Sequence, residues 1–281
     1  SFETKPIYSK YNIYIIKNRV SLIFSKKFHI LYKKVYGMMK MKNTFLMRVL
    51  LCLCLICIYF AAILTPLSSF ADDSIAQRKA KLTREVQTKK KMVALTFDDG
   101  PHPILTPKIL DLLKKYHAKA TFFVVGNKAE QFPDVLLRTY QEGHEIGNHT
   151  YDHILGKQIT ADRLQTELEH TDQIIKKITG TRTSLYRPVG GYCNAIIMDK
   201  AEENQKTIIL WSWHLDVRDW QLPPANYISS KIIQGVQPGN IILLHDWISM
   251  ENRTSSPTVE ALDHILAYLK KNGYECVTVS E

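Results

Sequence analysis

The repeated alternation of short apolar strands with helical segments is the feature of this 281-residue chain that most restricts its fold. An apolar run from Met92 to Phe97 is followed by a helical pattern of apolar residues that begins at Leu105, and this order recurs to the end of the chain. Strands that alternate with helices form parallel sheets, because each parallel pairing needs a crossover connection. About seven such units predict an α/β fold, a distorted (β/α) barrel that is TIM-like with about seven strands.

The predicted elements cover the chain from residue 92 onward. Strands are expected over residues 92–97, 120–125, 145–148, 184–187, 207–211, 241–245 and 275–279. Helices are expected from residue 105, and over residues 135–142, 161–179, 195–204, 225–234 and 258–271. Gly180 ends the longest helix, and a single domain accounts for all of these elements.

The segment before this alternation has the pattern of a secretion signal. A basic stretch that ends at Arg48 precedes an apolar stretch over residues 49–64, and the small residues Ser69 and Ala71 suit cleavage after Ala71. We therefore predict a signal peptide over residues 38–71 of a secreted or cell-wall-associated protein. An uncleaved membrane anchor is the alternative, although sixteen helical residues span only about 24 Å of a bilayer core of about 30 Å.

The net charge of +10 belongs to this leader and not to the predicted domain. Residues 1–71 hold eleven of the 37 Lys and Arg residues but only one of the 27 Asp and Glu residues. The remainder is close to neutral, which argues against nucleic-acid binding because phosphate neutralisation needs clustered positive charge. Residues 1–37, before the first methionine, are interpreted as an upstream or non-native extension, with a cytoplasmic extension as the alternative. The charged stretch over residues 72–91 is predicted to be a linker.

The cysteines do not indicate a disulfide framework. Three of the five lie in the apolar leader, which leaves Cys193 and Cys276 for the domain. One disulfide between them is possible, but a domain of this size obtains its stability from a hydrophobic core.

Two adjacent carboxylates end the first predicted strand. Asp98 and Asp99 stand between Phe97 and the pair Gly100-Pro101. Neighbouring side chains of a strand point to opposite faces, so one carboxylate could bind a metal ion while the other stays free as a base. This division suits metal-assisted hydrolysis. The alternative is an ordinary turn, since Asp-Gly-Pro is common turn chemistry.

Two histidines follow the third predicted strand at a spacing that allows both to bind one metal ion. His149 and His153 are four residues apart, so both imidazoles can point at one cation. With Asp99 they would form a three-ligand set with open positions for water and substrate, as in catalytic sites. The alternative is an exposed polar loop.

Three further motifs follow strands later in the chain: Arg187-Pro188-Val189-Gly190-Gly191, Asp216-Val217-Arg218-Asp219-Trp220 and Leu243-Leu244-His245-Asp246. Together with the carboxylate and histidine pairs, these motifs resemble the polysaccharide deacetylases of carbohydrate esterase family four, also called the NodB-homology domain. The resemblance spans about residues 92–280, and the predicted deacetylase domain covers residues 92–281. In the third motif Val189 and Gly190 stand where the family more often has a second proline and an aromatic residue.

The resemblance implies a role for each residue of the predicted site. It implies four catalytic residues, namely Asp98 as base, Arg187 as its partner, His245 as general acid and Asp219, which orients His245. It implies a metal site formed by Asp99, His149 and His153. It implies substrate contacts from a backbone N–H near Gly190, which faces the oxyanion, from Trp220 in the groove and from Leu243 beside the acetyl methyl group.

Some residues near these motifs have a second interpretation. Asp216 could be structural, and Arg187 could be an ordinary surface charge. Trp211 and Trp213 are expected to pack in the core, with stacking on a sugar as the alternative.

The activity implied by the resemblance is hydrolysis of a linear amide C–N bond that is not a peptide bond, which removes N-acetyl groups from a polysaccharide and releases acetate. The expected cofactor is one divalent metal ion, zinc first, with cobalt, nickel or manganese as alternatives. The expected partner is an N-acetylated glycan polymer, with N-acetylglucosamine of peptidoglycan first and chitin or chitooligosaccharides as the alternative. We expect a monomer that contacts a membrane only through an uncleaved leader and does not bind nucleic acid. Two rival functions are a wall-binding relative without turnover and an amidase for a small non-sugar substrate.

Overall fold

The computed structural model of the chain describes residues 82–157, 159–247 and 254–281. The predictions for residues 1–37 and 38–71, and for the linker up to residue 81, lie outside these residues. Within the three described ranges, no helix combines the length and the apolar composition that crossing a membrane requires.

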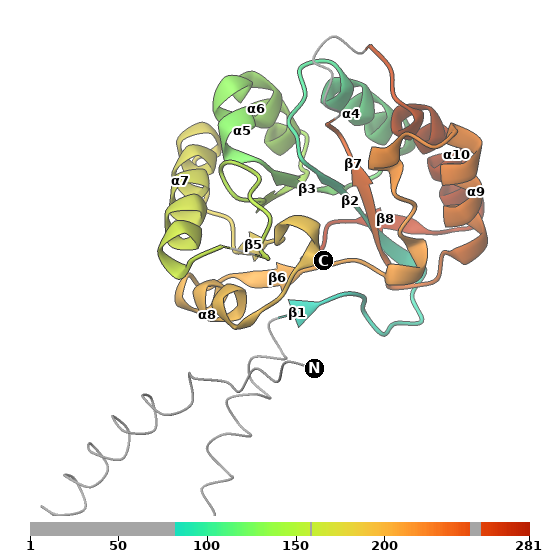
Figure 1. Cartoon of the computed structure of the whole chain (residues 1–281). Coiled ribbons are helices and arrows are strands. Elements are labelled where there is room, and N and C mark those ends of the chain that lie inside the picture. Colours follow the sequence, from blue (N-terminus) through green and yellow to red (C-terminus); the bar gives the residue numbers. More distant parts are fainter. Residues whose placement is uncertain (1–81, 158, 248–253) are drawn as a thin grey trace, which may run out of the picture. The chain divides into compact units, whose positions relative to one another are not determined.

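The described residues contain eight strands, all parallel, which form one sheet (Figure 1). The strands are β1 (Leu82–Thr83), β2 (Met92–Asp98), β3 (Thr121–Val124), β4 (Glu145–Asn148), β5 (Leu185–Tyr186), β6 (Thr207–Ile209), β7 (Ile241–His245) and β8 (Glu275–Val277). Their order is β1-β6-β5-β4-β3-β2-β7, and β8 pairs with the first half of β2. This arrangement confirms the predicted distorted α/β barrel.

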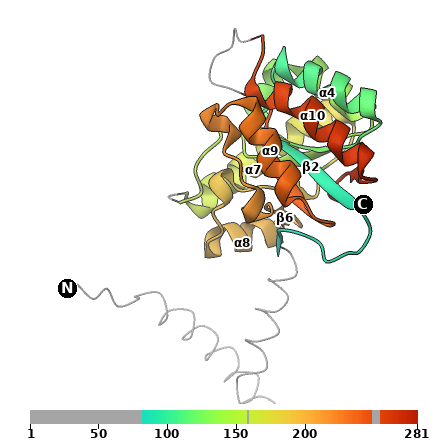
Figure 2. The ribbon, with the colours of Figure 1, turned by 90° about the vertical axis from the view of Figure 1, so that its right-hand side faces the viewer.

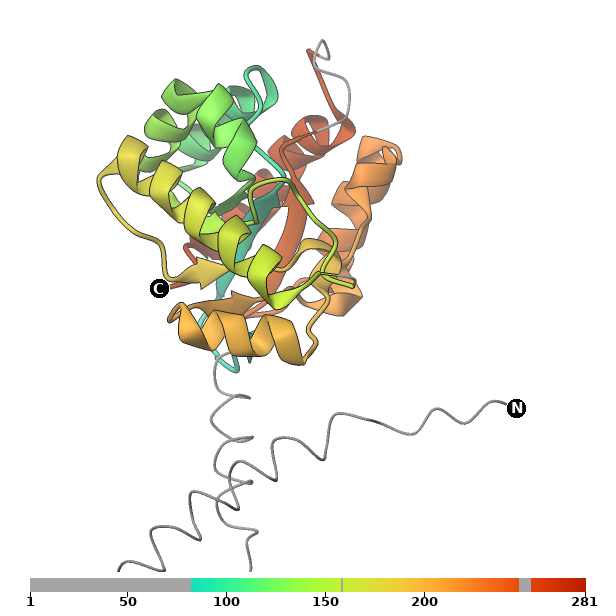
Figure 3. The ribbon, with the colours of Figure 1, turned by 60° about the vertical axis from the view of Figure 1, so that its left-hand side comes forward.

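The helices lie around the outside of the curved sheet. They are α4 (Leu105–Tyr116), α5 (Gly126–Gln131), α6 (Pro133–Gln141), α7 (Ala161–Thr179), α8 (Ala195–Glu203), α9 (Ala225–Gly235) and α10 (Pro257–Lys271), with short 3₁₀ turns η1 (Val189–Gly191), η2 (Trp213–Leu215) and η3 (Asp219–Gln221). Helices α4, α9 and α10 cover one side of the sheet (Figure 2), and α7 and α8 cover the side shown in Figure 3.

The barrel closes irregularly between β6 and β7. Where a regular barrel would have a strand ladder, Ser212 N–H donates to the carbonyl of Ile241 at 2.9 Å. The edge beyond β6 is covered by β1 and by an isolated bridge between Glu85 and Asn240. The charged stretch over residues 72–91, which we predicted to be a linker, therefore contains a two-residue strand. The sequence did not indicate this strand because its two residues are flanked by charged residues rather than by an apolar run.

Alternation along β2 divides the core into two parts. Val93, Leu95 and Phe97 belong to a cluster that includes buried residues of α4, α9 and α10, whereas Ala94 belongs to a second cluster with residues of β3, β7, α7 and α8. By the same period of two, Asp98 at the end of β2 faces the barrel interior. Every residue of β2 after Met92 is buried, so the strand places a carboxylate at the end of an apolar segment.

The long helix α7 has clear start and stop signals. Thr160 Oγ1 accepts a hydrogen bond from Arg163 N at the first turn, and Gly180 ends the helix with φ of +77°. The helix occupies the range that the sequence predicted, and its buried face includes Glu167, which contributes to the site described below.

Candidate active site

The first part of the site is an ion pair between Asp98 and Arg187. Arg187, directly after β5, is completely buried, and its Nη1 donates to Asp98 Oδ1 at 2.7 Å and to Thr96 Oγ1 at 2.8 Å. Its Nε and Nη2 donate to the carbonyls of Ile209 and Leu210, each at 3.0 Å. Burial lowers the pKa of Arg187, and the charge of Asp98 opposes that shift. Arg187 is therefore not a surface charge; it fixes the position of the Asp98 carboxylate.

The chain turns sharply after Asp98, which separates the two neighbouring carboxylates. Asp99 has φ of +77°, and its carbonyl accepts a hydrogen bond from Lys128 Nζ at 2.8 Å. Gly100 packs directly against the carboxylate of Asp246, so that an added Cβ would lie 2.1 Å from Asp246 Oδ2. A turn does follow Asp98, as one interpretation predicted, but it serves to orient the two side chains differently.

Replacing Gly100 with alanine is expected to lower the free energy of unfolding by about 2–3 kcal/mol, because a buried carboxylate occupies the space of the new methyl group. Urea unfolding of the purified protein measures the change. Gly180→Ala is the control, since no atom lies within 4 Å of its added Cβ; its own positive φ of +77° gives an expected loss of about 1 kcal/mol. A loss for Gly100→Ala no greater than that of the control would contradict the steric argument.

The loop after β4 carries the two histidines in a strained but well-supported conformation. Thr150 and His153 have φ of +70° and +53°. Asn148 Oδ1 accepts a hydrogen bond from Thr150 N at 2.9 Å. Glu167 Oε2, buried on α7, accepts the N–H groups of Tyr151 and of the next residue, each at 2.8 Å. Sequence analysis did not single out Asn148 or Glu167, because both side chains bind backbone N–H groups of the histidine loop and belong to none of the motifs.

The three predicted metal ligands come together in the structure. Asp99, His149 and His153 each offer a ligand atom, and these atoms all lie within 4.8 Å of one another. Asp99 Oδ1 lies 2.8 Å from His153 Nε2 and 3.4 Å from His149 Nε2. Burial alone raises the pKa of Asp99, but its polar contacts with both histidines and the charge of His245 lower that pKa well below its usual range. Asp99 is therefore a carboxylate.

The donor set fits a divalent cation. Asp99 Oδ1 is buried yet has no aligned hydrogen-bond donor among the described residues, although two imidazole nitrogens lie close to it. His149 Nδ1 donates to the carbonyl of Arg187 at 2.7 Å, so Nε2 is the ring nitrogen that faces Asp99. One carboxylate and two imidazoles with open positions are typical of catalytic metal sites.

Replacing His149 with alanine is expected to weaken metal binding more than about 100-fold. Loss of a residue that only hydrogen-bonds to a metal ligand already weakens binding about 10–100-fold, and loss of the ligand itself has a larger effect. Elemental analysis after dialysis measures the metal content. His264→Ala, on the exposed face of α10, is the control and is expected to retain the metal. Full metal occupancy in His149→Ala would show that His149 is not a ligand.

The opposite wall of the site holds a histidine–aspartate pair. His245 ends β7 and is the register partner of Asp98 on β2. Its Nδ1 lies 2.7 Å from Asp219 Oδ1, and Asp219 Oδ2 accepts the His245 backbone N–H and the Thr258 hydroxyl, each at 2.8 Å. Burial lowers the pKa of His245, but the charge of Asp219 and the hydrogen bond to it outweigh burial and raise the pKa to about 10. His245 is therefore protonated at neutral pH.

The remaining predicted residues lie within three positions of Arg187, Asp219 or His245 along the chain. Leu243 is buried inside the barrel, Gly190 has φ of +70° in η1, and Trp220 is 57% exposed. Trp211 is buried, as predicted. Trp213 is 52% exposed, so the prediction that it packs in the core is wrong; η2 turns its indole outward.

Asp216 supports the backbone of the fourth motif. Its Oδ1 accepts a hydrogen bond from Arg218 N at 3.1 Å, which agrees with the structural interpretation. The two cysteines of the domain, Cys193 and Cys276, are both free thiols.

A group of residues behind Asp99 was missed by sequence analysis. Asp246 Oδ2 accepts the hydroxyl of Thr106 at 2.6 Å; burial and the charge of Asp99 raise the pKa of Asp246 to about 7, although the Thr106 bond opposes this. Lys128 Nζ lies 3.7 Å from the ring centre of Trp247. Burial lowers the pKa of Lys128 to about 8, although the charges of Asp99 and Asp246 oppose this shift. Asp246 follows His245 in the fifth motif, which is a signal for it. Lys128 has no signal in the sequence.

Comparison with known proteins agrees with this geometry. A family model described as polysaccharide deacetylase matches residues 85–209. A peptidoglycan-N-acetylglucosamine deacetylase from Bacillus cereus is 40% identical over 200 residues, which cover 71% of this chain and 92% of the relative. The peptidoglycan-N-acetylmuramic acid deacetylase PdaC from Bacillus subtilis is 37% identical, but the match covers only 39% of that longer protein and 70% of this chain.

Solved structures show the same fold. The crystal structure of the Bc1960 peptidoglycan N-acetylglucosamine deacetylase, in complex with a naphthalenyl N-hydroxybenzamide, is 35% identical with a TM-score of 0.67 and covers 76% of this chain and 95% of that one. A family 4 acetyl xylan esterase from Clostridium thermocellum in complex with a cobalt ion is 36% identical with a TM-score of 0.60, covering 68% and 89%.

Proposed function

This chain belongs to the polysaccharide deacetylase family, carbohydrate esterase family four, and we propose that it removes N-acetyl groups from peptidoglycan N-acetylglucosamine outside the cell. One observation carries the proposal. Asp98 and His245 are register partners on neighbouring strands, and Asp99, His149 and His153 converge beside them. A base, an acid and a cation-binding set thus share one end of the barrel, which is what hydrolysis of an amide requires.

Asp98 is the proposed base. Its Oδ1 is occupied by Arg187, and its Oδ2 lies 3.7 Å from His149 Nε2, on the side of the donor set. A water in that space would give its proton to Asp98 Oδ2 as it attacks the acetamide carbonyl. Arg187 keeps the carboxylate oriented during this transfer.

His245 is the proposed acid. Asp219 holds its Nδ1, which leaves Nε2–H to protonate the sugar nitrogen as the C–N bond breaks. The products are acetate and an amino sugar. The buried Asp219 and its bond from Thr258 keep the imidazole in one orientation and favour its protonated form.

Asp99, His149 and His153 are the residues that would hold the metal ion. Such an ion, when bound, supplies Lewis-acid polarisation of the carbonyl and lowers the pKa of water to about 7. Zinc is our first choice, because two imidazoles and one carboxylate suit it; the related acetyl xylan esterase was crystallised in complex with a cobalt ion, which supports metal binding.

The relatives support peptidoglycan as the polymer. The curated relatives named above are deacetylases of N-acetylglucosamine or N-acetylmuramic acid in peptidoglycan. Chitin oligosaccharides present the same acetamide and remain the second candidate. Both Asp98 and His245 are present with their partners, which argues against a wall-binding relative without turnover.

The test is mass spectrometry of purified peptidoglycan, N-acetylglucosamine oligomers and small non-sugar amides after incubation with the zinc-loaded protein. We expect loss of acetyl groups from peptidoglycan, no hydrolysis of the small amides, loss of activity with a chelator and recovery with zinc. Faster hydrolysis of the small amides than of any glycan would contradict the proposal, and so would activity that survives complete removal of metal. Mass determination of the protein recovered from culture medium tests secretion and cleavage after Ala71.

A further inference from the structure

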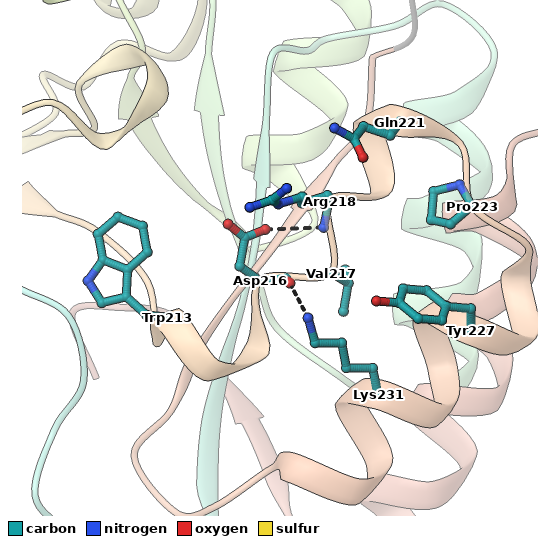
Figure 4. Close-up of a pocket in the computed structure, with 8 residues that line it drawn as sticks. All are labelled: Trp213, Asp216, Val217, Arg218, Gln221, Pro223, Tyr227 and Lys231. Carbon is teal, nitrogen blue, oxygen red and sulfur yellow. Dashed lines mark hydrogen bonds between the residues drawn. The ribbon is translucent and has the colours of Figure 1, made fainter.

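A surface pocket of about 600 Å³ lies beside the fourth motif and has no role in the chemistry described above. It is formed by η2, the segment that leads to η3 and the first turns of α9 (Figure 4). Its volume falls within the range of about 300–1,000 Å³ that is usual for small-ligand sites. Arg218 in its wall immediately precedes Asp219, so the pocket adjoins the His245–Asp219 pair along the chain.

Two exposed aromatic rings border this pocket. Trp213 and Tyr227 are 52% and 50% exposed, and they lie on opposite sides of Asp216 and Arg218 in Figure 4. The indole of Trp213 contacts Trp211 edge to face, with ring centres 4.8 Å apart, and the guanidinium of Arg84 lies 4.7 Å from its centre. A fixed, exposed aromatic plane provides an apolar surface on which a sugar ring can stack.

Arg218 is held in a strained conformation between these rings. Its φ is +49°, an uncommon value for a residue with a long side chain. Three hydrogen bonds support the turn: Arg218 N to Asp216 Oδ1, Gln221 N to the Arg218 carbonyl, and Lys231 Nζ to the Asp216 carbonyl at 2.6 Å. Strain that is kept in place by several contacts is characteristic of ligand-binding sites.

The guanidinium of Arg218 is available to a ligand. Within the described ranges it has no hydrogen bond or ion pair, and the residue is exposed. The lining of the pocket is net positive, because Arg218 and Lys231 carry two positive charges and Asp216 carries one negative charge. A free guanidinium suits a carboxylate, which it can bind with two parallel hydrogen bonds.

We propose that this pocket is an accessory subsite for a sugar that carries a carboxylate, with Arg218 on the carboxylate and Trp213 and Tyr227 against the sugar ring. The inference rests on the proposed function, since it places this sugar next to the unit that is deacetylated on the same strand. An alternating N-acetylglucosamine and N-acetylmuramic acid strand has such a carboxylate on every second sugar, whereas a chitin oligomer has none. The subsite thus selects the anionic polymer over the neutral one.

The test compares acetate release from two oligosaccharides of equal length, one neutral and one alternating. Arg218→Ala is expected to raise KM for the alternating oligomer about tenfold with kcat unchanged, the size of one lost charge-assisted hydrogen bond, and to leave the neutral oligomer unaffected. Tyr227→Ala is expected to raise KM for both oligomers roughly 2–10-fold. Arg182→Ala, an exposed arginine between α7 and β5, is the matched control and is expected to change neither.

Binding measurements separate this inference from the proposed function. Calorimetric titration of both oligomers into Asp98→Asn, with and without Arg218→Ala, measures affinity without turnover. Arg218→Ala is expected to raise the dissociation constant of the alternating oligomer about tenfold and to leave that of the neutral oligomer unchanged, whether or not acetate release is seen. Equal effects of Arg218→Ala on both oligomers, or no effect on either, would overturn the subsite. Absence of acetate release with a preserved difference in binding would instead refute the proposed function.

Discussion

The variant Asp98→Asn is expected to release acetate about 10²–10⁴-fold more slowly than the wild type, because the amide cannot take a proton from water. Asparagine keeps the shape of the side chain and an oxygen for Arg187 Nη1, so the barrel is retained. Arg187 also keeps its bonds to Thr96, Ile209 and Leu210. The measurement is kcat at saturating glycan with the metal content of each sample determined alongside.

Loss of the carboxylate charge leaves Arg187 buried without its counter-charge, so thermal unfolding is recorded for the same samples. Asp111→Asn, which removes an exposed carboxylate paired with Arg138, is the control and is expected to keep full activity. If a folded, metal-containing Asp98→Asn protein turned over glycan at the wild-type rate, another group would have to be the base.

The variant His245→Ala is expected to show the second large effect, also about 10²–10⁴-fold in kcat, because the sugar amine is a poor leaving group unless it is protonated. This loss depends on the substrate. On an aryl acetate, whose phenolate leaves without a proton, His245→Ala is expected to lose much less activity, whereas Asp98→Asn is impaired on both substrates. Equal losses on glycan and aryl acetate would exclude His245 as the acid.

The pH dependence gives an independent test of the same pair. In the folded protein the pKa of His245 is raised to about 10, so its acid form persists through neutral pH and is lost on the alkaline side. Asp219→Asn removes the largest of the charges that raise this pKa, the others being those of Asp99 and Asp98, and we expect the alkaline limb of kcat to move to lower pH. Because the folded pKa exceeds the ordinary value of 6.5, the pair stabilises the fold fully below pH 6.5 and loses this contribution as pH rises toward 10. Urea unfolding between pH 6.5 and 10 measures the contribution of the pair to stability. If Asp219→Asn did not move the alkaline limb of kcat, the assignment of His245 as the acid would be contradicted.

Much of the fold could be predicted because its signals are local. The predicted ranges of β4 and β7 coincide with the observed strands, and β7 has the clearer signal because four consecutive apolar residues, Ile241 to Leu244, precede His245. Helix α7 matches because Thr160 and Gly180 mark its ends. The missed elements have weak local signals: α5 begins at a glycine and carries mainly polar residues, and β1 has two residues that pair because the edge of β6 is open to them.

The candidate site could be predicted where chain order alone brings residues together. Carboxyl ends of parallel strands meet at one end of a barrel, so Asp98 and Asp99 at the end of β2, the histidines after β4 and His245 at the end of β7 had to be neighbours. Support from a distant helix could not be predicted in this way. Glu167 holds the histidine loop from α7, and Thr258 holds Asp219 from 39 residues away.

By itself, then, the sequence of this protein determined the alternation of strands and helices, the position of the carboxylate pair, the histidine pair and His245 at or just after strand ends, and through its motifs the family. Tertiary structure alone decided the environment of those groups. It buried Arg187 against Asp98 across 89 residues, gave His245 its raised pKa and turned Trp213 and Arg218 outward to line a surface pocket. The reason is physical: periodicity and turn chemistry act over a few residues, whereas burial, charge pairing and desolvation depend on contacts that exist only after the barrel has closed.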